Sequence, residues 1–344
     1  MSKQKIIYIS RKMTGYKSAS YQQDVMDELA RQAQVRFYGP GFSEYDVNDS
    51  INDVLDKVPF EPDFIILGHA WLNDTDGGEV DPHPKLQLAK TAIPKIAILN
   101  KEYTNLSAKL NYYKKNRFNT GFTHHHEVGR YSQETGINFI FWPFAFQKEK
   151  FDRIISDKTI DVSFSGILQN LNKNSLQSDI RVRIMRSFFI TMFDIPIIKR
   201  KPFKRIEIFW NSIARNNIGR NISSLLKKRQ FYSIDDYVKI MQSTKIYINT
   251  LSPMGLISPR FFECMASKSL IFCERSSLYA NIFPDDLYIT FNNDLSDFKE
   301  KLFLILSDRS MRHQITDKAY KYVYTKHTWE KRVTSLLNDI SFNY

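Results

Sequence analysis

An arginine and a glutamate, Arg260 and Glu263, lie three residues apart at the predicted start of a helix. Ser258 is a favourable N-cap and Pro259 a favourable first helical residue, so we expect the helix to begin there. The free N–H groups of a helix N-terminus attract phosphate, and an arginine beside them adds a forked cationic donor. Glu263 lies on the same helix face and can accept hydrogen bonds from two ribose hydroxyls. The segment therefore predicts a site for a nucleoside diphosphate.

The alternative is a structural role for the same segment. Arg260 and Glu263 would then form an ion pair on a helix surface, with the phenylalanines between them in the core, and such pairs contribute little to stability. The location favours the binding role. The helix follows a predicted strand at residues 245–249, and doubly wound sheets bind ligands at the carboxyl ends of their strands.

The elements that must position this segment begin at Lys5, where short β-rich runs start to alternate with segments of helical period. This alternation is typical of a parallel sheet covered by helices. Strands are predicted at residues 5–10, 35–38, 63–67, 95–99 and 138–141, and helices at 21–32, 47–56, 84–91 and 104–114. In the second of these helices, one apolar face is expected from Val47, Ile51, Val54 and Leu55. These elements form one Rossmann-like unit.

A second α/β unit follows an aromatic-rich stretch that passes into polar residues at 147–150. Its strands are predicted at residues 160–165, 245–249, 269–273 and 287–290, and its helices at 179–192, 233–242, after Pro259, and from there to the C-terminus. A length of 344 residues favours two domains. We expect a first domain at 1–152, a second at 153–326, and a C-terminal helix at 327–344 that packs back towards the first domain.

The run SPRFFECMAS at residues 258–267 resembles the nucleotide-binding signature of group 1 glycosyltransferases, especially the subgroup related to spore-maturation proteins. YTKHTWEKRV at 324–333 is similar to the closing HTW-x-x-R helix of that family. IDVSFSG at 160–166 looks like the strand and glycine that open its second domain. The resemblance covers residues 160–340 well, and the N-terminal half only by strand order. It implies a GT-B fold, an α/β architecture of two Rossmann-like domains facing across a cleft.

The resemblance also implies that the donor nucleotide binds the C-terminal domain and the acceptor mainly the N-terminal one. By the resemblance, Arg260 contacts the diphosphate and Glu263 the ribose, and Ser258, Gly255 and Gly166 belong to the same donor site. We expect a nucleotide sugar, a UDP-sugar in first place, as co-substrate, with no bound cofactor and no metal. In such a site arginine, lysine and helix N-termini must stabilise the departing nucleoside diphosphate.

Two residues depart from the family pattern. Many retaining members have a glutamate eight residues before the position of Glu263, but Gly255 stands there, so retention of the anomeric configuration is not implied. Lys268 replaces the usual glycine after the M-A-x triplet. This replacement puts the geometry of that turn in question, although not the helix before it.

A base that takes the proton of an acceptor hydroxyl should come from the first domain. Glu102 follows the predicted strand at 95–99, and AILNKEY is similar to the strand and catalytic acid of the phage DNA β-glucosyltransferase. Glu102 is equally explained as a carboxylate at a helix start. His69 follows the strand at 63–67 and competes as base or acceptor ligand, with a structural role as its alternative.

Other polar groups give weaker signals. His124, His125 and His126 suggest a metal site, but neighbouring residues of a strand point to alternating faces and cannot all bind one ion, so we expect at most one of them in the cleft. Asp74 and Asp76 spell Asp-x-Asp, and we interpret them as part of a solvated or acceptor-side loop. A loop around Gly15 and Tyr16 is a candidate lip of the cleft, without a full glycine-rich fingerprint.

The bulk composition restricts the class of protein. With 42% hydrophobic and 25% charged residues, the sequence is typical of a folded soluble protein. No apolar run reaches the roughly 20 residues needed to cross a bilayer, and no secretory signal is visible, so we expect a cytoplasmic location, with peripheral contact at the inner membrane face left open. Cys264 and Cys273 lie in apolar surroundings and support no disulfide framework.

The net charge of +12 favours anionic partners without choosing among nucleotide sugars, phospholipid surfaces and nucleic acids. The leading interpretation is transfer of a sugar to a bacterial surface glycan or its lipid-linked precursor. One alternative is glycosylation of modified bases in DNA. Another is a catalytically silent protein that binds nucleotide sugars or nucleic acid.

Overall fold

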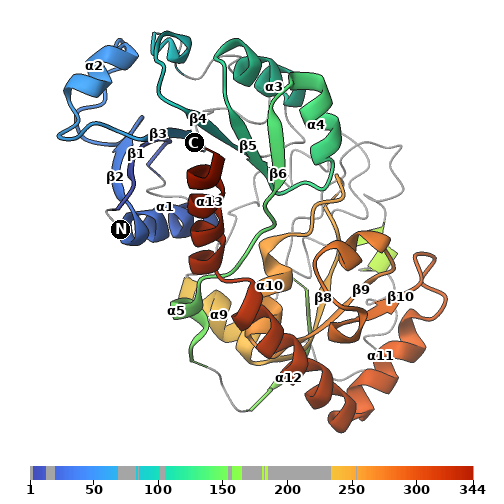
Figure 1. Ribbon diagram of the computed structural model, residues 1–344. Helices are drawn as coiled ribbons and strands as arrows, with labels where there is room; N and C mark the ends of the chain where they lie inside the picture. Colours follow the sequence, from blue (N-terminus) through green and yellow to red (C-terminus); the bar gives the residue numbers. More distant parts are fainter. Residues whose placement is uncertain are drawn as a thin grey trace, which may run out of the picture. The chain divides into compact units, whose positions relative to one another are not determined.

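The computed structural model describes residues 3–12, 20–68, 83, 85–100, 105–153, 157–164, 180–181, 183–184, 234–252 and 254–343 (Figure 1). The chain forms two compact units. Unit 1 consists of Met1–Gln147, Met254–Pro259 and Lys326–Tyr344, and unit 2 consists of Lys148–Pro253 and Arg260–Thr325.

Unit 1 is built on a six-stranded sheet in the order β2-β1-β3-β4-β5-β6, with every pair of neighbours parallel. Its strands are β1 (Lys5–Ile9), β2 (Gln34–Tyr38), β3 (Phe64–Leu67), β4 (Lys95–Leu99), β5 (Thr120–Thr123) and β6 (Asn138–Phe141). Its helical elements are α1 (Ser20–Gln32), α2 (Ile51–Asp56), η1 (Leu88–Lys90), α3 (Leu106–Lys115), α4 (Val128–Thr135) and α13 (Trp329–Asn343). The chain runs from β1 to β2 on one side and then crosses to β3 on the other side of β1, so the strand order reverses at β1.

Alternating residues of the strands pack on opposite faces of this sheet. On one face, Ile7 and Ile65 share a buried cluster with Ile51 of α2, Leu110 of α3 and Tyr131 of α4. Helices α1 and α13 contact each other and lie side by side in Figure 1. Burying both faces is the usual condition of a parallel sheet, and it explains why the central strands β3 and β4 read as nearly continuous apolar runs.

The HTW-x-x-R motif attaches α13 to the segment after β6. The Arg332 guanidinium donates to the carbonyl oxygens of Pro143, at 2.9 Å, and Lys326, and it contacts His327 Nδ1. Trp142 Nε1 returns a bond of 3.0 Å to the Arg332 carbonyl. The motif therefore has a structural role at the end of the chain.

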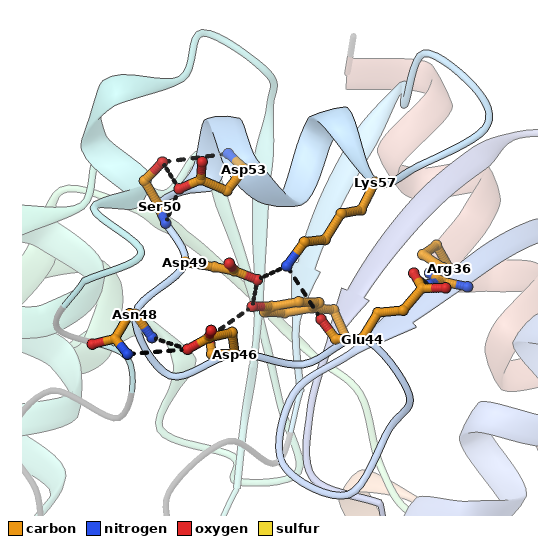
Figure 2. Close-up of polar contacts among 9 residues, drawn as sticks. Arg36, Glu44, Asp46, Asn48, Asp49, Ser50, Asp53 and Lys57 are labelled. Carbon is orange, nitrogen blue, oxygen red and sulfur yellow. Dashed lines mark hydrogen bonds and ion pairs between the residues drawn. The ribbon is translucent and has the colours of Figure 1, made fainter.

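Helix α2 is shorter than predicted because a capping box defines its start. Ser50 Oγ accepts from the Asp53 backbone N–H, and the Asp53 carboxylate accepts from the Ser50 N–H at 2.7 Å (Figure 2). Val47 lies outside the helix and is 58% exposed, so its assignment to the apolar face was wrong. The polar residues before Ser50 instead form a loop, in which the Asp49 carboxylate accepts from Tyr38 Oη at 2.6 Å and from Lys57 Nζ.

Other elements of unit 1 differ from the prediction. Strand β5, TGFT, was missed because its glycine and threonines give no apolar run. The glycine is required by packing, since a Cβ at Gly121 would lie 2.4 Å from the Phe139 ring. Helix α4 was missed as well. Within the predicted helix at 84–91, the described residues form only the short η1 element. The other strands of the first half were predicted to within one residue at each end.

Unit 2 contains a four-stranded parallel sheet in the order β10-β9-β8-β7. Its elements are α5 (Lys148–Phe151), β7 (Ile160–Phe164), α9 (Ile234–Gln242), β8 (Thr244–Asn249), α10 (Pro259–Ala266), β9 (Leu270–Glu274), η2 (Ser277–Asn281), η3 (Asp285–Leu287), β10 (Ile289–Phe291), α11 (Phe298–Ser307) and α12 (Arg309–Lys326). One face of the sheet packs Ile246 and Phe272 against Phe298 and Leu302 of α11 and against Ile184.

The prediction for unit 2 was close at its strands and at α9 and α10. Of the predicted helix at 179–192, residues 180, 181, 183 and 184 are described and helical. The other residues of that range lie outside the described part of the chain. The last strand, β10, begins at residue 289, two residues later than predicted, because residues 285–287 form a short 3-10 element before it.

Candidate functional site

The predicted helix start is confirmed, since α10 begins at Pro259 directly after Ser258. The expected side-chain cap is not formed, because within the described residues the buried Ser258 Oγ has no hydrogen-bond partner. Buried hydroxyls in folded proteins usually have a hydrogen-bond partner, so this one is available to a ligand. Arg260 lies in the first turn and is only partly exposed. The helix therefore starts with a hydroxyl and a guanidinium close together in sequence.

Tyr237 of α9, which the sequence did not single out, orients Glu263. Its Oη donates to Glu263 Oε2 at 2.8 Å. Burial and the nearby Glu263 carboxylate raise the pKa of Tyr237 well above its usual value, so the phenol remains a donor at neutral pH. Glu263 is partly buried, in contrast to the exposed surface pair of the alternative interpretation. The side chain that the sequence assigned to ribose binding is thus held by a tyrosine of the preceding helix.

A second charged pair lies at the carboxyl ends of β8 and β9. Arg181 Nε donates to Thr250 Oγ1 at 2.6 Å, and its Nη2 donates to the Leu251 carbonyl at 3.0 Å. Glu274, the last residue of β9, accepts from the Leu251 N–H at 2.7 Å and is only 6% exposed. The turn after β8 is therefore held from both sides, by a cation on its carbonyl and by a carboxylate on its amide.

Electrostatic coupling joins this pair to the start of α10. Burial, followed by the charge of Arg260, lowers the pKa of Arg181 to about 10, which still leaves the guanidinium charged at neutral pH. Burial raises the pKa of Glu274, and Arg181 acts in the opposite direction. Arg181 thus interacts electrostatically with both Arg260 and Glu274, and two neighbouring guanidinium groups at this strand edge suit a diphosphate.

The structure gives a backbone reason for each departure from the family pattern. Gly255 has a φ of 75°, in the left-handed region that only glycine adopts at no steric cost, so a side chain is disfavoured there. Lys268 also has a positive φ, 50°, in the turn after α10. The turn expected for glycine is thus kept, and Lys268 Nζ contacts Asp317 Oδ1 at 2.8 Å.

The three consecutive histidines lie in the bend after β5 and not on a strand. His124 is buried, its Nδ1 is 2.7 Å from the Trp142 carbonyl, and its ring stacks on Phe144. His125 contacts the carbonyl of Met254. Among the described residues, no group of histidine, cysteine, aspartate or glutamate side chains could hold a metal ion.

Several predicted site residues lie outside the described part of the chain. They are Glu102, His69, Gly166, Gly15, Tyr16, Asp74 and Asp76. Cys264 and Cys273 are buried free thiols, as expected. No helix in the described ranges has both the length and the apolar character needed to span a membrane.

Comparison with known proteins agrees with this architecture. Residues 204–338 match the model of a family described as glycosyl transferase-like. No curated protein matches the sequence. An α-glucosyltransferase solved with UDP and a 13-mer DNA containing a central A:G mismatch is 13% identical, with 99% of each chain covered and a TM-score of 0.60. HepE from Anabaena, solved with UDP-glucose, is 9% identical, with 98% of this chain and 99% of that chain covered and a TM-score of 0.60.

Sucrose-phosphate synthase from Thermosynechococcus elongatus is 10% identical, with 99% of each chain covered and a TM-score of 0.60. At such identities the similarity concerns the fold. The protein therefore has the two-domain α/β fold of GT-B glycosyltransferases, and the fold class expected from the sequence is confirmed.

Proposed function

We propose that the protein transfers a sugar from a nucleoside diphosphate sugar, a UDP-sugar in first place, to an acceptor hydroxyl. The observation that carries the proposal is the arrangement at the start of α10, where the buried, unpartnered Ser258 hydroxyl and Arg260 begin a helix that follows β8. Helix N-termini and arginines at the carboxyl ends of parallel strands are suited to diphosphates. The family match over residues 204–338 covers this segment and supports the same activity.

Each group then has a role in the reaction. The acceptor oxygen forms a bond to the anomeric carbon, while the bond from that carbon to the diphosphate oxygen breaks and its electron pair leaves with UDP. Arg260 and the N-terminus of α10 stabilise the negative charge that develops on the leaving group, without a metal ion. Glu263, oriented by Tyr237, binds the ribose, with Gly255 and Gly166 as further donor-site residues. The acceptor proton passes to a base, for which Glu102 and His69 are the candidates.

For the acceptor, we favour a bacterial surface glycan or its lipid-linked precursor, with the enzyme in the cytoplasm or at the inner face of the membrane. A DNA acceptor is the second candidate. Two observations favour it: the net charge of +12, and the similarity to an α-glucosyltransferase solved with DNA. A DNA acceptor requires that affinity fall steeply as salt rises, because bound counterions are released.

The first experiment is a thermal-shift screen with UDP, GDP, CMP and dTDP and their sugars, with and without EDTA. A ligand that binds only the folded state raises its apparent stability, so the true donor gives the largest shift, and EDTA leaves that shift unchanged. If no nucleotide raises the melting temperature at millimolar concentration, the proposal is wrong.

A second experiment tests the base. Release of UDP from the donor identified by the screen is measured for wild type, Glu102→Ala and His69→Ala, with Glu149→Ala, an exposed residue of α5, as the matched control. Loss of the base should lower turnover by 100-fold or more, on the order of a general base's contribution. Unchanged turnover in both variants would refute both assignments while leaving donor binding intact.

A further inference from the structure

The segment that leads into α10 is a tight turn that groups with unit 1. It runs over Met254–Pro259. The turn contains the left-handed Gly255. Leu256 and Ile257 are buried, with 8% and 6% exposure, whereas the Met254 side chain is 43% exposed. The backbone of Met254 must therefore be held mainly by polar contacts if the turn is to keep one conformation.

His125 provides such a contact. Its Nε2 lies 2.7 Å from the Met254 carbonyl oxygen. Its Nδ1 accepts from the Glu127 backbone N–H at 3.2 Å, and its own N–H donates to Thr123 Oγ1 at 3.1 Å. A carbonyl only accepts, so Nε2 must carry the proton, and the Glu127 N–H requires a lone pair on Nδ1. The neutral Nε2–H tautomer satisfies both contacts.

The surroundings of His125 favour that neutral form. The side chain is buried, with 4% exposure, and burial lowers its pKa. Within the described part of the chain, the charged and titratable groups that face it are His126, whose ring centroid lies 4.4 Å away, the Glu127 carboxylate at 3.7 Å from Nδ1, Arg130, and Tyr131, whose ring centroid lies 6.0 Å away. The Met254–Pro259 segment adds no charged group. The ring is therefore a fixed single donor to the turn.

We propose that His125 is a positioning residue of the donor site: its Nε2–H bond to the Met254 carbonyl fixes the turn that sets where Ser258 and Arg260 meet the diphosphate. The inference rests on the proposed function. Met254 precedes Ser258 by four residues, and the glycine between them gives the turn backbone freedom that the bond removes. Freezing this freedom before the ligand arrives lowers the entropic cost of binding.

The test compares two replacements that separate hydrogen bonding from packing. Gln can place an amide nitrogen near the position of Nε2 and donate to the carbonyl, but it lacks a ring. Phe keeps a ring of similar size and cannot donate. His126→Gln, which removes the neighbouring imidazole, is the matched control. Hydrogen exchange of residues 254–258 is measured without ligand, and UDP affinity is measured by calorimetry.

If the bond positions the turn, His125→Phe speeds exchange in 254–258 and weakens UDP binding about 10-fold, the effect of losing one buried hydrogen bond. His125→Gln and His126→Gln then remain within about 3-fold of wild type in UDP affinity. A packing role gives the reverse order, with Phe better than Gln, and overturns the proposal. The proposal is also overturned if His125→Phe speeds hydrogen exchange in 254–258 but leaves UDP affinity unchanged.

The two proposals fail in different ways. If wild-type protein does not bind UDP or another nucleotide, the donor-site function is wrong and His125 has no donor site to position. Exchange in 254–258 then still reports whether the His125 bond holds the turn. If wild type binds UDP and all variants bind equally, the proposed function stands and the role of His125 is refuted.

Discussion

The carboxyl ends of the parallel strands carry different chemistry in the two units. In unit 1, buried histidines follow β5 and pack among aromatic rings, and burial lowers the pKa values of His124 and His125. In unit 2, the corresponding edge carries Arg181, Arg260 and the buried Glu274. Burial favours the neutral form of the histidines at the first edge, whereas the second edge carries two guanidinium groups beside a buried carboxyl. Both sheets are parallel, yet the strand edge of unit 1 is packed with aromatic rings and that of unit 2 carries the charged groups to which we assign the diphosphate.

The largest expected effect is the loss of unit 1 in mild acid. Four of its histidines are buried with lowered pKa values: His83 and His124, each to about 4, His327, to about 3, and His125. The unfolded chain, with histidine pKa values near 6.5, binds more protons, so stability is fully present above pH 6.5 and is lost as pH falls towards 4. A shift from 6.5 to about 4 corresponds to about 3 kcal/mol for His124 alone.

Urea unfolding at pH 7.5, 6 and 5, followed by tryptophan fluorescence, measures this loss. His124→Gln keeps a possible donor to the Trp142 carbonyl and does not titrate, so its stability should depend less on pH than that of wild type. His313→Gln, at an exposed position of α12, is the matched substitution. A wild-type stability that stays constant from pH 7.5 to 5 would contradict the neutral-edge interpretation.

In unit 2, the largest effect is expected from Glu274→Ala. The change leaves the Leu251 N–H without its acceptor and Arg181 without its nearby carboxylate, and breaking a buried charged arrangement from one side costs about 3 kcal/mol. Glu274→Gln retains an acceptor oxygen and should lose less. Burial raises the pKa of Glu274, which means that burial disfavours its charged form. The Gln variant carries no charge, so it reports the contribution of the hydrogen bond to Leu251 alone. Urea midpoints of the two variants at pH 7 give the comparison, and equal losses would contradict it.

Arg260→Ala tests whether the charged edge binds an anion. One charge-assisted contact to a diphosphate contributes about 2 kcal/mol, so UDP affinity should fall about 30-fold with little change in the melting temperature of the free protein. Arg309→Ala, on the exposed side of α12, removes the same charge elsewhere in unit 2 and should have less than a 2-fold effect. Titration calorimetry at 50 and 150 mM salt measures both. Equal losses in the two variants would indicate a general charge effect and no site.

The sequence predicted the charged edge better than the neutral one. The start of α10 was predicted from local rules, because a proline directly after a serine is typical of a first helical residue, although the serine cap itself does not form. Arg181, Tyr237 and Glu274 were missed, since they lie far from Arg260 along the chain and only the sheet brings them to one edge. Glu274 had a usable signal, an acidic residue that ends an apolar strand.

The histidines show the opposite case. His124, His125 and His126 were placed on a strand, and the missed strand β5 ends just before them. Its sequence, TGFT, has no apolar periodicity, because Gly121 leaves room for the Phe139 ring of the neighbouring strand. A tertiary contact therefore determined the residue type, and a local pattern could not reveal it. The contact of His125 with Met254 joins residues 129 positions apart, which is also beyond local rules.

The smallest expected effect concerns the turn that ends α10. Lys268 holds a left-handed backbone, which costs a non-glycine residue on the order of 1 kcal/mol. Lys268→Ala keeps the backbone strain and removes the ion pair with Asp317. Because both side chains of this pair are partly exposed, the free energy of unfolding should fall by only a few tenths of a kcal/mol. Lys268→Gly also removes the strain and should be about 0.5 to 1 kcal/mol more stable than the Ala variant. Urea midpoints measure the difference. The turn lies at the far end of α10 from Arg260, so UDP affinity should be equal in the two variants. If the less stable variant instead binds UDP more weakly, the charged edge depends on the whole helix and not on its first turn.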